Sequence, residues 1–311
     1  MLQSTATMHG VTTRWSRHAW AAIFILPAAL IYGAFIFYPL VATVVWGFLE
    51  WNGTSAVSFA GFGNFRTLFT LYPFNTQLFS AVLHNIVFFL LSIIVQLLFG
   101  LILAVLLRAR AKSRVFLQAI YTLPFMMSPI IVGYLWNLIL NPIFGPVYEA
   151  LHATGLGNLY APWLGQSSTA LVTLSLISSW QSIGLPMLLF YAALSTIPSE
   201  IYEAAKMDGC TGLQTFRWII LPLVAPTAAV LTLLTFVASF NLFDLPYAVG
   251  GVNGAPNGAL DVAGLLFYRL AFTGTGNGLG VGSAMATMIG LILLAFTTAL
   301  LWYRRLAERW V

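Results

Sequence analysis

Long apolar runs alternate with short polar segments along most of the chain. A helix needs roughly 20 mostly apolar residues to cross about 30 Å of hydrocarbon. Six runs reach that length: residues 19–48, 78–107, 115–140, 168–194, 221–245 and 281–303. The pattern predicts an all-α, polytopic membrane protein with six transmembrane helices. We therefore divide the chain into an N-terminal tail (1–18), a transmembrane domain (19–303) and a C-terminal tail (304–311).

The composition agrees with this fold class. Hydrophobic residues make up 60% of the chain and charged residues only 7%, whereas soluble domains average about 25% charged residues. The first apolar run follows a short basic head, but it is too long for the apolar core of a secretory signal and ends without an A-x-A-like site. We therefore interpret it as a retained anchor. Cys210 is the single cysteine, which excludes an internal disulfide.

The distribution of positive charge predicts the orientation in the membrane. Lys and Arg near the ends of spans are retained in the cytoplasm. All of the 13 Lys and Arg residues except Arg66 and Arg269 fall in the two tails or in the loops after the second and fourth spans. Both termini and these two loops are therefore expected to be cytoplasmic. Nucleic acid is not an expected partner, because no basic patch is interleaved with stacking aromatic residues.

Two spans contain residues that break helices. Pro124 and Pro129 interrupt the third span, and Gly184 and Pro186 interrupt the fourth. Proline withdraws a hydrogen bond from a preceding carbonyl, and the freed carbonyl must face protein or water and not lipid. These kinks either serve helix packing or line a translocation pathway, and the sequence leaves both interpretations open.

Polar and small residues also occur inside the apolar runs. Gly282, Ala286 and Gly290 share one face of the last span, which favours close helix packing. Asn241 and Asp244 are expected near the outer end of the fifth helix. A carboxylate at membrane depth is costly and usually functional.

The cytoplasmic loop 196–220 is predicted to form two short helices. Ser199 is placed to cap a helix that begins at Glu200, and Asp208 and Gly209 end it. Thr211 and Gln214 have capping-box spacing, so a second helix begins at Gly212 and leads to Leu221 and Pro222.

The first of these helices carries a candidate docking surface. Its residues Glu203, Ala204, Ala205 and Asp208 suit a surface that docks into a groove of a soluble partner. From the residues alone, a solvated amphipathic loop is an equal alternative.

From Glu203 to Pro222 the chain reads E-A-A-x-x-D-G-x(6)-F-x-x-I-x-L-P. This pattern resembles the EAA loop of permease subunits in binding-protein-dependent ABC importers, and the resemblance extends over most of the chain. Supporting segments are 61–65 (GFGNF), Asn85 and 280–284 (GVGSA). The chain departs from the family around the paired glycines Gly250 and Gly251. The family commonly has a threonine before this pair and a proline directly after it, whereas this chain has Val249 before the pair and its proline later, at Pro256.

The resemblance implies a type I ABC importer permease fold in the bacterial cytoplasmic (inner) membrane, similar to the maltose and glycerol-3-phosphate importers. It implies three protein partners: a second permease subunit, a cytoplasmic ATPase dimer and an extracytoplasmic solute-binding protein. The coupling residues are then Glu203, Ala204, Ala205, Asp208 and Gly209. No cofactor is expected on this chain, since it lacks a G-x-x-x-x-G-K-[ST] loop and ATP and Mg would bind the partner ATPase.

A carbohydrate or related polar solute is the implied cargo. Such solutes are bound by hydrogen bonds to hydroxyl groups and by stacking on aromatic faces. Polar and aromatic residues in the interrupted spans are therefore the candidate pathway residues: Tyr134, Asn137, Trp180, Gln181, Asn241, Asp244 and Tyr247. Packing or an interfacial belt is the alternative for the aromatic residues, and interhelical hydrogen bonds are the alternative for the amides.

Two other classes of function compete with an importer permease. A secondary carrier or channel would work without an ATPase, but the spans show no proton-relay string or ring of charges. An intramembrane enzyme would need a catalytic constellation, and neither a Ser-His-Asp arrangement nor paired carboxylates are found. His84 has no second His or Cys at ligand spacing, so no metal is expected.

Overall fold

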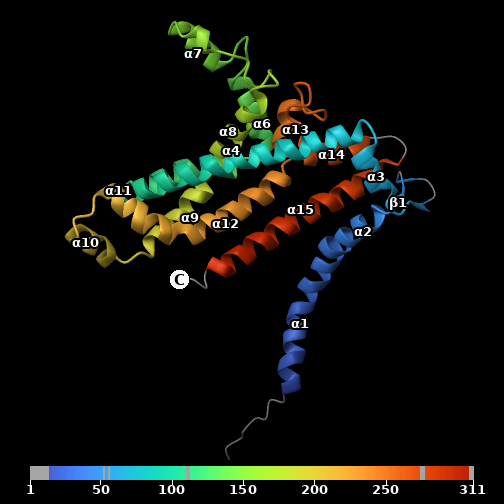
Figure 1. Cartoon of the computed structure of the whole chain (residues 1–311), viewed down its shortest axis with the longest axis horizontal. Coiled ribbons are helices and arrows are strands. Elements are labelled where there is room, and N and C mark those ends of the chain that lie inside the picture. Colours follow the sequence, from blue (N-terminus) through green and yellow to red (C-terminus); the bar gives the residue numbers. More distant parts are fainter. Residues whose placement is uncertain (1–13, 52, 55–56, 110–112, 274–276, 308–311) are drawn as a thin grey trace, which may run out of the picture.

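The computed structural model describes residues 14–51, 53–54, 57–109, 113–273 and 277–307. Most of the two predicted tails, 1–13 and 308–311, lies outside the described residues, as do Arg110, Lys112 and Arg309. The described part is almost entirely helical (Figure 1).

The helices accommodate the six predicted spans. Four are long and apolar enough to cross a membrane: Ala22–Trp46, Phe74–Arg108, Gly212–Phe240 and Gly278–Trp302. Two further candidates are bent pairs, Arg114–Met126 with Pro129–Ile139 (97°) and Ala170–Ser182 with Gly184–Ser195 (50°). Counted as one span each, they bring the described residues to six, which agrees with the prediction and shows that the Pro and Gly interruptions cause sharp bends.

The N-terminal segment forms one continuous helix and a small ribbon. The helix comprises α1 (Arg14–Tyr32), a π-helical turn η1 (Gly33–Phe37) and α2 (Tyr38–Trp46). Its end α2 packs on the last helix, while α1 stands away from the other helices (Figure 1). Strands β1 (Leu49–Glu50) and β2 (Ser58–Phe59) pair antiparallel and precede α3 (Gly63–Thr70).

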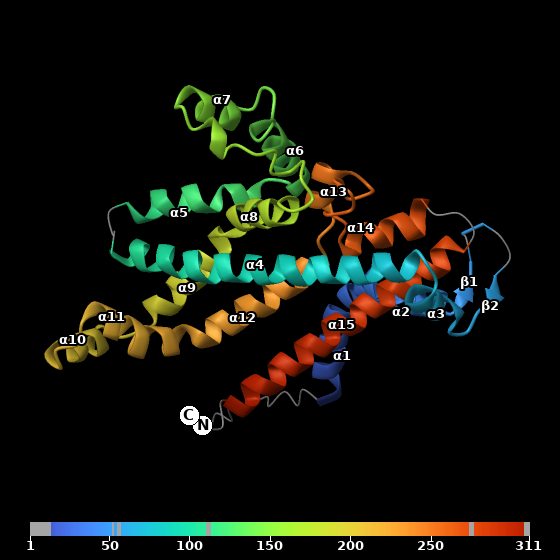
Figure 2. The same cartoon turned by 45° about the horizontal axis from the view of Figure 1, so that its top comes forward.

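The helix α4 (Phe74–Ala109) is the centre of the bundle. Its 36 residues give a length of about 54 Å at 1.5 Å per residue, and it runs along the whole bundle in Figure 2. It packs against α8 (Ala170–Ser182), α9 (Gly184–Ser195) and α12 (Leu221–Phe240). Close contact requires small residues: a Cβ on Gly100 would lie 2.8 Å from the Cβ of Pro186, and one on Gly184 would lie 2.6 Å from the carbonyl oxygen of Tyr121.

The segment between α4 and α8 forms the third span and a layer that projects from the bundle. It consists of α5 (Arg114–Thr122), the 3₁₀ turn η2 (Pro124–Met126), α6 (Pro129–Ile139), α7 (Pro146–Ala153) and the 3₁₀ turn η3 (Gly157–Leu159). In Figure 1, α7 lies at the tip of this layer, at the top of the view.

The C-terminal half begins with α10 (Ser199–Met207) and α11 (Gly212–Thr215), at one end of the bundle (Figure 2). We call this the inner end, in accordance with the predicted topology. A π-helical turn η4 (Phe216–Ile220) joins α11 to α12, and α13 (Asp244–Gly250), α14 (Ala263–Tyr268), η5 (Arg269–Thr273) and α15 (Gly278–Ala307) complete the chain. The opposite end, with β1, β2, α3 and α13, is the outer end.

The fifth predicted span, 221–245, is wrong at its outer boundary. Helix α12 ends at Phe240, Asn241 lies in the cap position after it, and Asp244 begins the separate helix α13. The two residues therefore do not share a helix, in contrast to the prediction. Pro246 explains the break, because its ring would clash with the carbonyl of Leu242 in a continuous helix.

Candidate functional site

The predicted coupling loop forms two helices, but its first cap differs from the prediction. Pro198 occupies the N-cap position with φ −56° and ψ 145°, and Ser199 is the first helical residue. The prediction that Ser199 caps the helix is therefore wrong. The extended backbone at Pro198 ends the preceding turn, so the helix begins one residue earlier.

Helix α10 ends in a Schellman turn at Gly209. The amide of Gly209 donates to the carbonyl of Lys206 (3.1 Å), and the amide of Cys210 donates to the carbonyl of Ala205 (2.9 Å). Gly209 has a φ of +72°, a conformation that glycine adopts without penalty. The position of Gly209 is thus set by backbone geometry, since no neighbouring atom lies within 4 Å of where its Cβ would be.

The second helix begins with the predicted capping box. The amide of Thr211 donates to Oε1 of Gln214 (2.7 Å), and the amide of Gln214 donates to Oγ1 of Thr211 (3.4 Å). From Gly212 the helical path continues through η4 into α12, as one span to Phe240. The loop is therefore directly continuous with a long helix of the bundle.

The motif residues do not all face outward. Glu203, Ala204 and Asp208 are exposed, whereas Ala205 is buried, with 4% of its surface accessible. The prediction that both alanines form the docking surface is therefore wrong for Ala205. Adjacent helical residues point about 100° apart, and Ala205 lies on the side of α10 that also holds half-buried Tyr202.

A cation fixes this inner side of α10 to the bundle. Arg108, at the end of α4, donates from Nη1 to the carbonyl of Leu194 (2.6 Å) and to the hydroxyl of Tyr202 (2.6 Å). Its guanidinium also lies 4.4 Å from the centre of the Tyr202 ring, a favourable cation–π distance. Tyr202 and Phe216 pack against the buried cluster that contains Phe190. Arg108 thereby joins α4, α9 and α10.

Sequence reasoning missed Arg108 and Tyr202 as parts of this site. Arg108 entered the prediction only as an indicator of membrane orientation. Tyr202 and Ala205 are three residues apart and so lie on one helix face, which is a signal that could have indicated an inward side of α10.

Two amides among the predicted pathway residues are engaged in contacts between helices. Gln181 is buried and donates to the carbonyl of Met127 (2.9 Å). Asn137 donates to the carbonyl of Ala248 (3.4 Å), which joins α6 to α13. The Asn137 contact matches the alternative of interhelical hydrogen bonding that the sequence left open, whereas the Gln181 contact joins α8 to the bend between η2 and α6.

The aromatic candidates in the third and fourth spans lie at the surface of the chain. Tyr134 is exposed on α6. Trp180 is partly exposed and lies edge to face with Trp136, with 5.5 Å between ring centres. Both side chains remain accessible to a neighbouring subunit, a solute or lipid.

The candidates after α12 lie beside a pocket. Asn241 borders a pocket of about 450 Å³ between α12, α14 and α15. Tyr247 stacks on Phe243, a second residue of its wall, with 5.3 Å between ring centres. Asp244 is exposed at the first residue of α13, next to Phe243. These three are the predicted residues that the fold brings together around an open space.

The small-residue face of the last span has two uses. A Cβ on Gly282 would lie 2.7 Å from the Cβ of Ala271, so this glycine allows close packing. Ala286 and Gly290 instead line the same pocket as Asn241. The sequence interpretation, that this face serves close helix packing, is therefore correct for Gly282 but does not account for Ala286 and Gly290.

A second pocket, which lies within the bundle, was not predicted from the sequence. It has a volume of about 180 Å³, lies between α4, α8, α9 and α12, and includes Gln96 and Ser92 in its wall. Gln96 donates from Nε2 to the hydroxyl of Ser182 (3.0 Å) and accepts from the hydroxyl of Thr235 (2.9 Å). The signal was a polar stripe on α4, because Asn85, Ser92 and Gln96 recur at helical spacing.

Metal ligation has no candidate in the part of the chain that the structure describes. There, no three His, Cys, Asp or Glu side chains lie close enough together to hold a metal ion.

Comparison with known proteins places the chain among transport proteins. The family model described as "Binding-protein-dependent transport system inner membrane component" matches residues 96–311. The probable ABC transporter permease protein YurN of Bacillus subtilis is 32% identical over 278 residues, which cover 88% of this chain and 92% of that protein. The probable starch degradation products transport system permease protein AmyD of Thermoanaerobacterium thermosulfurigenes is 30% identical over 274 residues (88% and 90%). The trehalose/maltose transport system permease protein MalF of Thermococcus litoralis is 29% identical over 277 residues (88% and 90%).

Solved structures share the fold. A chain of a bacterial ABC transporter involved in the import of the acidic polysaccharide alginate superposes with a TM-score of 0.77 at 23% identity, covering 94% of this chain and 96% of that one. A chain of the bacterial alginate ABC transporter in complex with alginate pentasaccharide-bound periplasmic protein gives 0.74 at 22% identity (96% and 98%). At such identities the similarity confirms the permease fold alone.

Proposed function

The chain belongs to the family of binding-protein-dependent transport system inner membrane components, and from this premise we propose how it couples ATP hydrolysis to the import of a carbohydrate. As a family member it is a non-catalytic permease subunit of an ABC importer in the membrane. Such a subunit forms part of the translocation pathway for the solute and changes conformation during transport.

We propose that α10 and α11 dock into the cytoplasmic ATPase dimer, which binds ATP and Mg. The observation that carries this proposal is the exposed face formed by Glu203, Ala204 and Asp208, which the turn at Gly209 joins to the helical path from Gly212 to Phe240. Gly209 sets the angle between the two helices. Because Arg108 holds α10 against α4 and α9, the docked helix is attached to two helices of the bundle.

The passage is proposed to form with a second permease subunit. The apolar side chains of Ala22–Trp46 are exposed in the isolated chain, which suits contact with a partner subunit and with the lipid of a bacterial cytoplasmic membrane. Asn241 and Tyr247 line this chain's half of the pathway, with Asp244 at its outer mouth; Tyr134 and Trp180 flank it. ATP binding inside and the loaded binding protein outside shift the subunit pair between two states only through their different affinities for those states.

A carbohydrate is the proposed cargo. Two of the three relatives described above are named for sugar systems, one for starch degradation products and one for trehalose and maltose. Amide and aromatic side chains such as Asn241 and Tyr247 have the chemistry to hydrogen-bond sugar hydroxyls and to stack on sugar rings.

The coupling proposal is tested in vesicles that contain the complete importer with its ATPase and binding protein. We expect the double variant Glu203→Lys with Gly209→Pro to abolish ATP-driven uptake, because it reverses the charge of the docking face and removes the turn. Glu149→Lys, the same charge change on exposed α7 in the layer that projects from the bundle, serves as the matched control and should transport normally. Unchanged uptake by the double variant would contradict the coupling proposal.

The proposed cargo is tested separately with the same vesicles. We expect uptake of at least one member of a panel of labelled mono-, di- and oligosaccharides to depend on ATP. If the intact importer transports only amino acids, peptides or inorganic ions from a parallel panel, the carbohydrate assignment fails while the coupling mechanism stands.

A further inference from the structure

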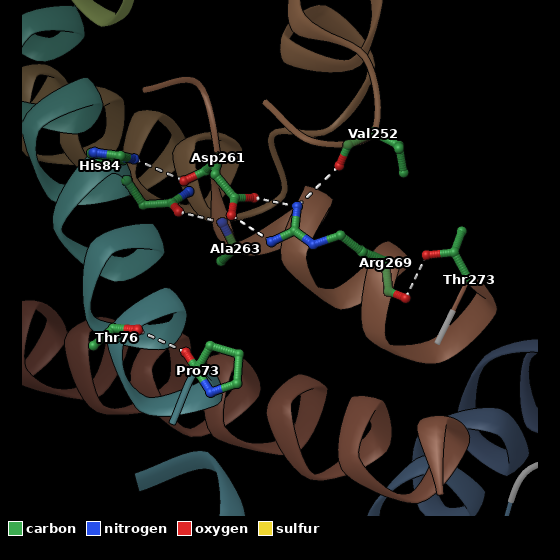
Figure 3. A network of polar contacts seen from close by, with 9 residues as sticks. Pro73, Thr76, His84, Val252, Asp261, Ala263, Arg269 and Thr273 are labelled. Atoms are coloured by element: carbon green, nitrogen blue, oxygen red, sulfur yellow. Dashed lines mark hydrogen bonds and ion pairs between the residues drawn. The ribbon is translucent and has the colours of Figure 1, made fainter. Parts of the chain in front are cut away.

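An outer loop, residues 251–262 between α13 and α14, is closed by one guanidinium. Arg269, at the start of η5, donates from Nη1 to the carbonyl of Val252 (3.0 Å) at the beginning of the loop. It also forms a fork with the carboxylate of Asp261 at the end of the loop, through Nη1 to Oδ1 (3.1 Å) and Nη2 to Oδ2 (2.5 Å). Figure 3 shows the guanidinium between these two loop ends. This side chain thus bridges the two ends of the loop, and backbone hydrogen bonds such as that from the amide of Leu260 to the carbonyl of Gly254 (3.0 Å) also link its two sides.

The same loop end is held from the other side by α4. A ring nitrogen of His84, Nδ1, lies 2.9 Å from the carbonyl oxygen of Asp261. Asn85 is fully buried; its Oδ1 accepts from the amide of Ala263 (2.7 Å), and its Nδ2 donates to the carbonyl of Ser239 (2.5 Å). The Asp261 segment is therefore anchored between α4, α12 and η5.

The ion pair lies in a site that disfavours an isolated charge. The side chains of Arg269 and Asp261 are 19% and 10% exposed, and theirs is the one ion pair found among the described residues. Burial raises the pKa of the Asp261 carboxyl, while the hydrogen bond and the positive charge of Arg269 act to lower it. Removing Arg269 alone would leave a buried carboxylate without its partner, which is more harmful than removing both charges.

The clamped loop frames a polar pocket at the outer end. The pocket has a volume of about 580 Å³, and its wall combines one face of α4, with Thr76, Ser80 and His84, with the loop residues Asn253 and Asn257 and the ion pair. Asn257 has a φ of 49°, in the left-handed region that asparagine tolerates well. The wall offers hydroxyl, amide and imidazole groups on a fixed backbone, which is the chemistry of a protein-binding surface with many hydrogen bonds.

We propose that Arg269 is a positioning residue that holds the outer loop 251–262 in one conformation, preformed for docking of the solute-binding protein. This inference rests on the proposed function, because it assumes that such a protein delivers the solute. A loop that is already ordered loses little conformational entropy on docking, so the clamp lowers the concentration of binding protein that the importer needs. Because Arg269 contacts Val252 and Asp261, at the two ends of the loop, it restricts the backbone conformation of the residues between them.

The test uses the complete importer in vesicles and measures ATP hydrolysis as solute-loaded binding protein is titrated. We expect Arg269→Gln to raise the half-maximal concentration of binding protein tenfold or more, while the maximal rate at saturation changes less than twofold. Asp261→Asn combined with Arg269→Gln should recover part of this loss, because no unpaired charge remains, and Arg269→Lys should lie between wild type and Arg269→Gln. Arg66→Gln replaces an exposed outer arginine on α3 and should match wild type.

Three outcomes would overturn the inference. The first is an unchanged half-maximal concentration in Arg269→Gln. The second is a loss of maximal rate alone, which would indicate a structural role or a role in the passage. The third is a changed dependence on free solute at constant binding protein, which would make the pocket a solute site. If the wild-type importer is not stimulated by any binding protein, the proposed function itself fails, and this result is separate from the other three.

Discussion

The two ends of the bundle hold their loops in opposite ways. At the inner end, α10 exposes its charged residues Glu203 and Asp208 and keeps Ala205 and Tyr202 against the bundle. At the outer end, the loop 251–262 turns its charged residue Asp261 inward, against Arg269. A loop that presents charge to a partner is thus anchored by its small and aromatic residues, whereas a loop that presents amide groups is anchored by its charges.

Both loops are nevertheless tied to the same helix. Arg108 holds the inner loop, and His84 and Asn85 hold the outer one, all from α4. The two attachment points are 23 residues apart (108 − 85), or about 35 Å along a helix. A straight helix that contacts both loops offers a physical connection between the two ends of the subunit, and substitutions at each end test the two attachments separately.

The largest effect is expected from changing the inner turn. Gly209→Val forces a β-branched residue into a φ of +72°, which costs about 1–3 kcal/mol and re-aims α10. We expect ATP-driven uptake to fall more than tenfold. Gly209→Asn is the matched control, because asparagine tolerates this conformation and the position has no close neighbour. Equal uptake by the two variants would contradict a conformational role for Gly209.

The next effect concerns the outer anchor. Asn85→Ala leaves the amide of Ala263 and the carbonyl of Ser239 without their side-chain partner. Each unsatisfied buried group costs about 1–3 kcal/mol, so we expect a clear fall in the thermal unfolding temperature of the purified subunit in detergent. Asn253→Ala, in the loop facing the outer pocket, should leave it almost unchanged. A stable Asn85→Ala variant would show that the outer loop has other anchors.

A smaller effect is expected from the inner anchor, because it is partly exposed. Arg108→Met retains an apolar side chain of similar length but loses both hydrogen bonds and the cation–π contact, with an expected cost of about 1–2 kcal/mol. Tyr202→Phe removes one hydroxyl and should cost about 0.5–1 kcal/mol. Denaturation by guanidinium chloride measures both. A larger loss of unfolding free energy in Tyr202→Phe than in Arg108→Met would contradict the role of Arg108 as the inner anchor.

The smallest effect on stability is expected between the two ends. Asn241 is exposed at the cap of α12, so Asn241→Ala should change the free energy of unfolding by less than about 0.5 kcal/mol. If Asn241 contacts the solute, uptake should still fall severalfold at a low solute concentration. Gln181→Ala provides the contrast: its loss of a buried bond to Met127 should lower stability. Normal uptake by Asn241→Ala would remove Asn241 from the proposed pathway.

The local signals in the sequence were sufficient for much of the fold. Six apolar runs predicted the spans, and the Pro and Gly interruptions coincide with the bends of 97° and 50°. The Thr211–Gln214 capping box and the stop at Gly209 were also correct. Each of these features depends on residues within a few positions of one another, where helix geometry and backbone preference act directly.

The two errors in helix boundaries arose where two local signals competed. Ser199 is a good capping residue, but the adjacent Pro198 already imposes the extended backbone of an N-cap. The apolar run 221–245 reads as one helix, but Pro246 ends it after Phe240 and makes Asp244 the start of another. In both cases the fixed backbone of proline decided the boundary.

Tertiary structure decided which polar side chains are engaged and which remain open. The hydrogen-bond partner of Gln181 lies 54 residues away along the chain, that of Asn137 lies 111 away, and those of Asn85 lie 154 and 178 away. No local pattern encodes those separations. Arg269 could be identified from the sequence as an outer arginine, but its place between Val252 and Asp261 depends on how α4, α13 and η5 pack. The sequence by itself determined the spans and predicted the orientation and the coupling motif, because hydrophobicity and capping act locally. The folded structure determined the anchors of both loops, because buried hydrogen bonds and ion pairs need partners from distant segments.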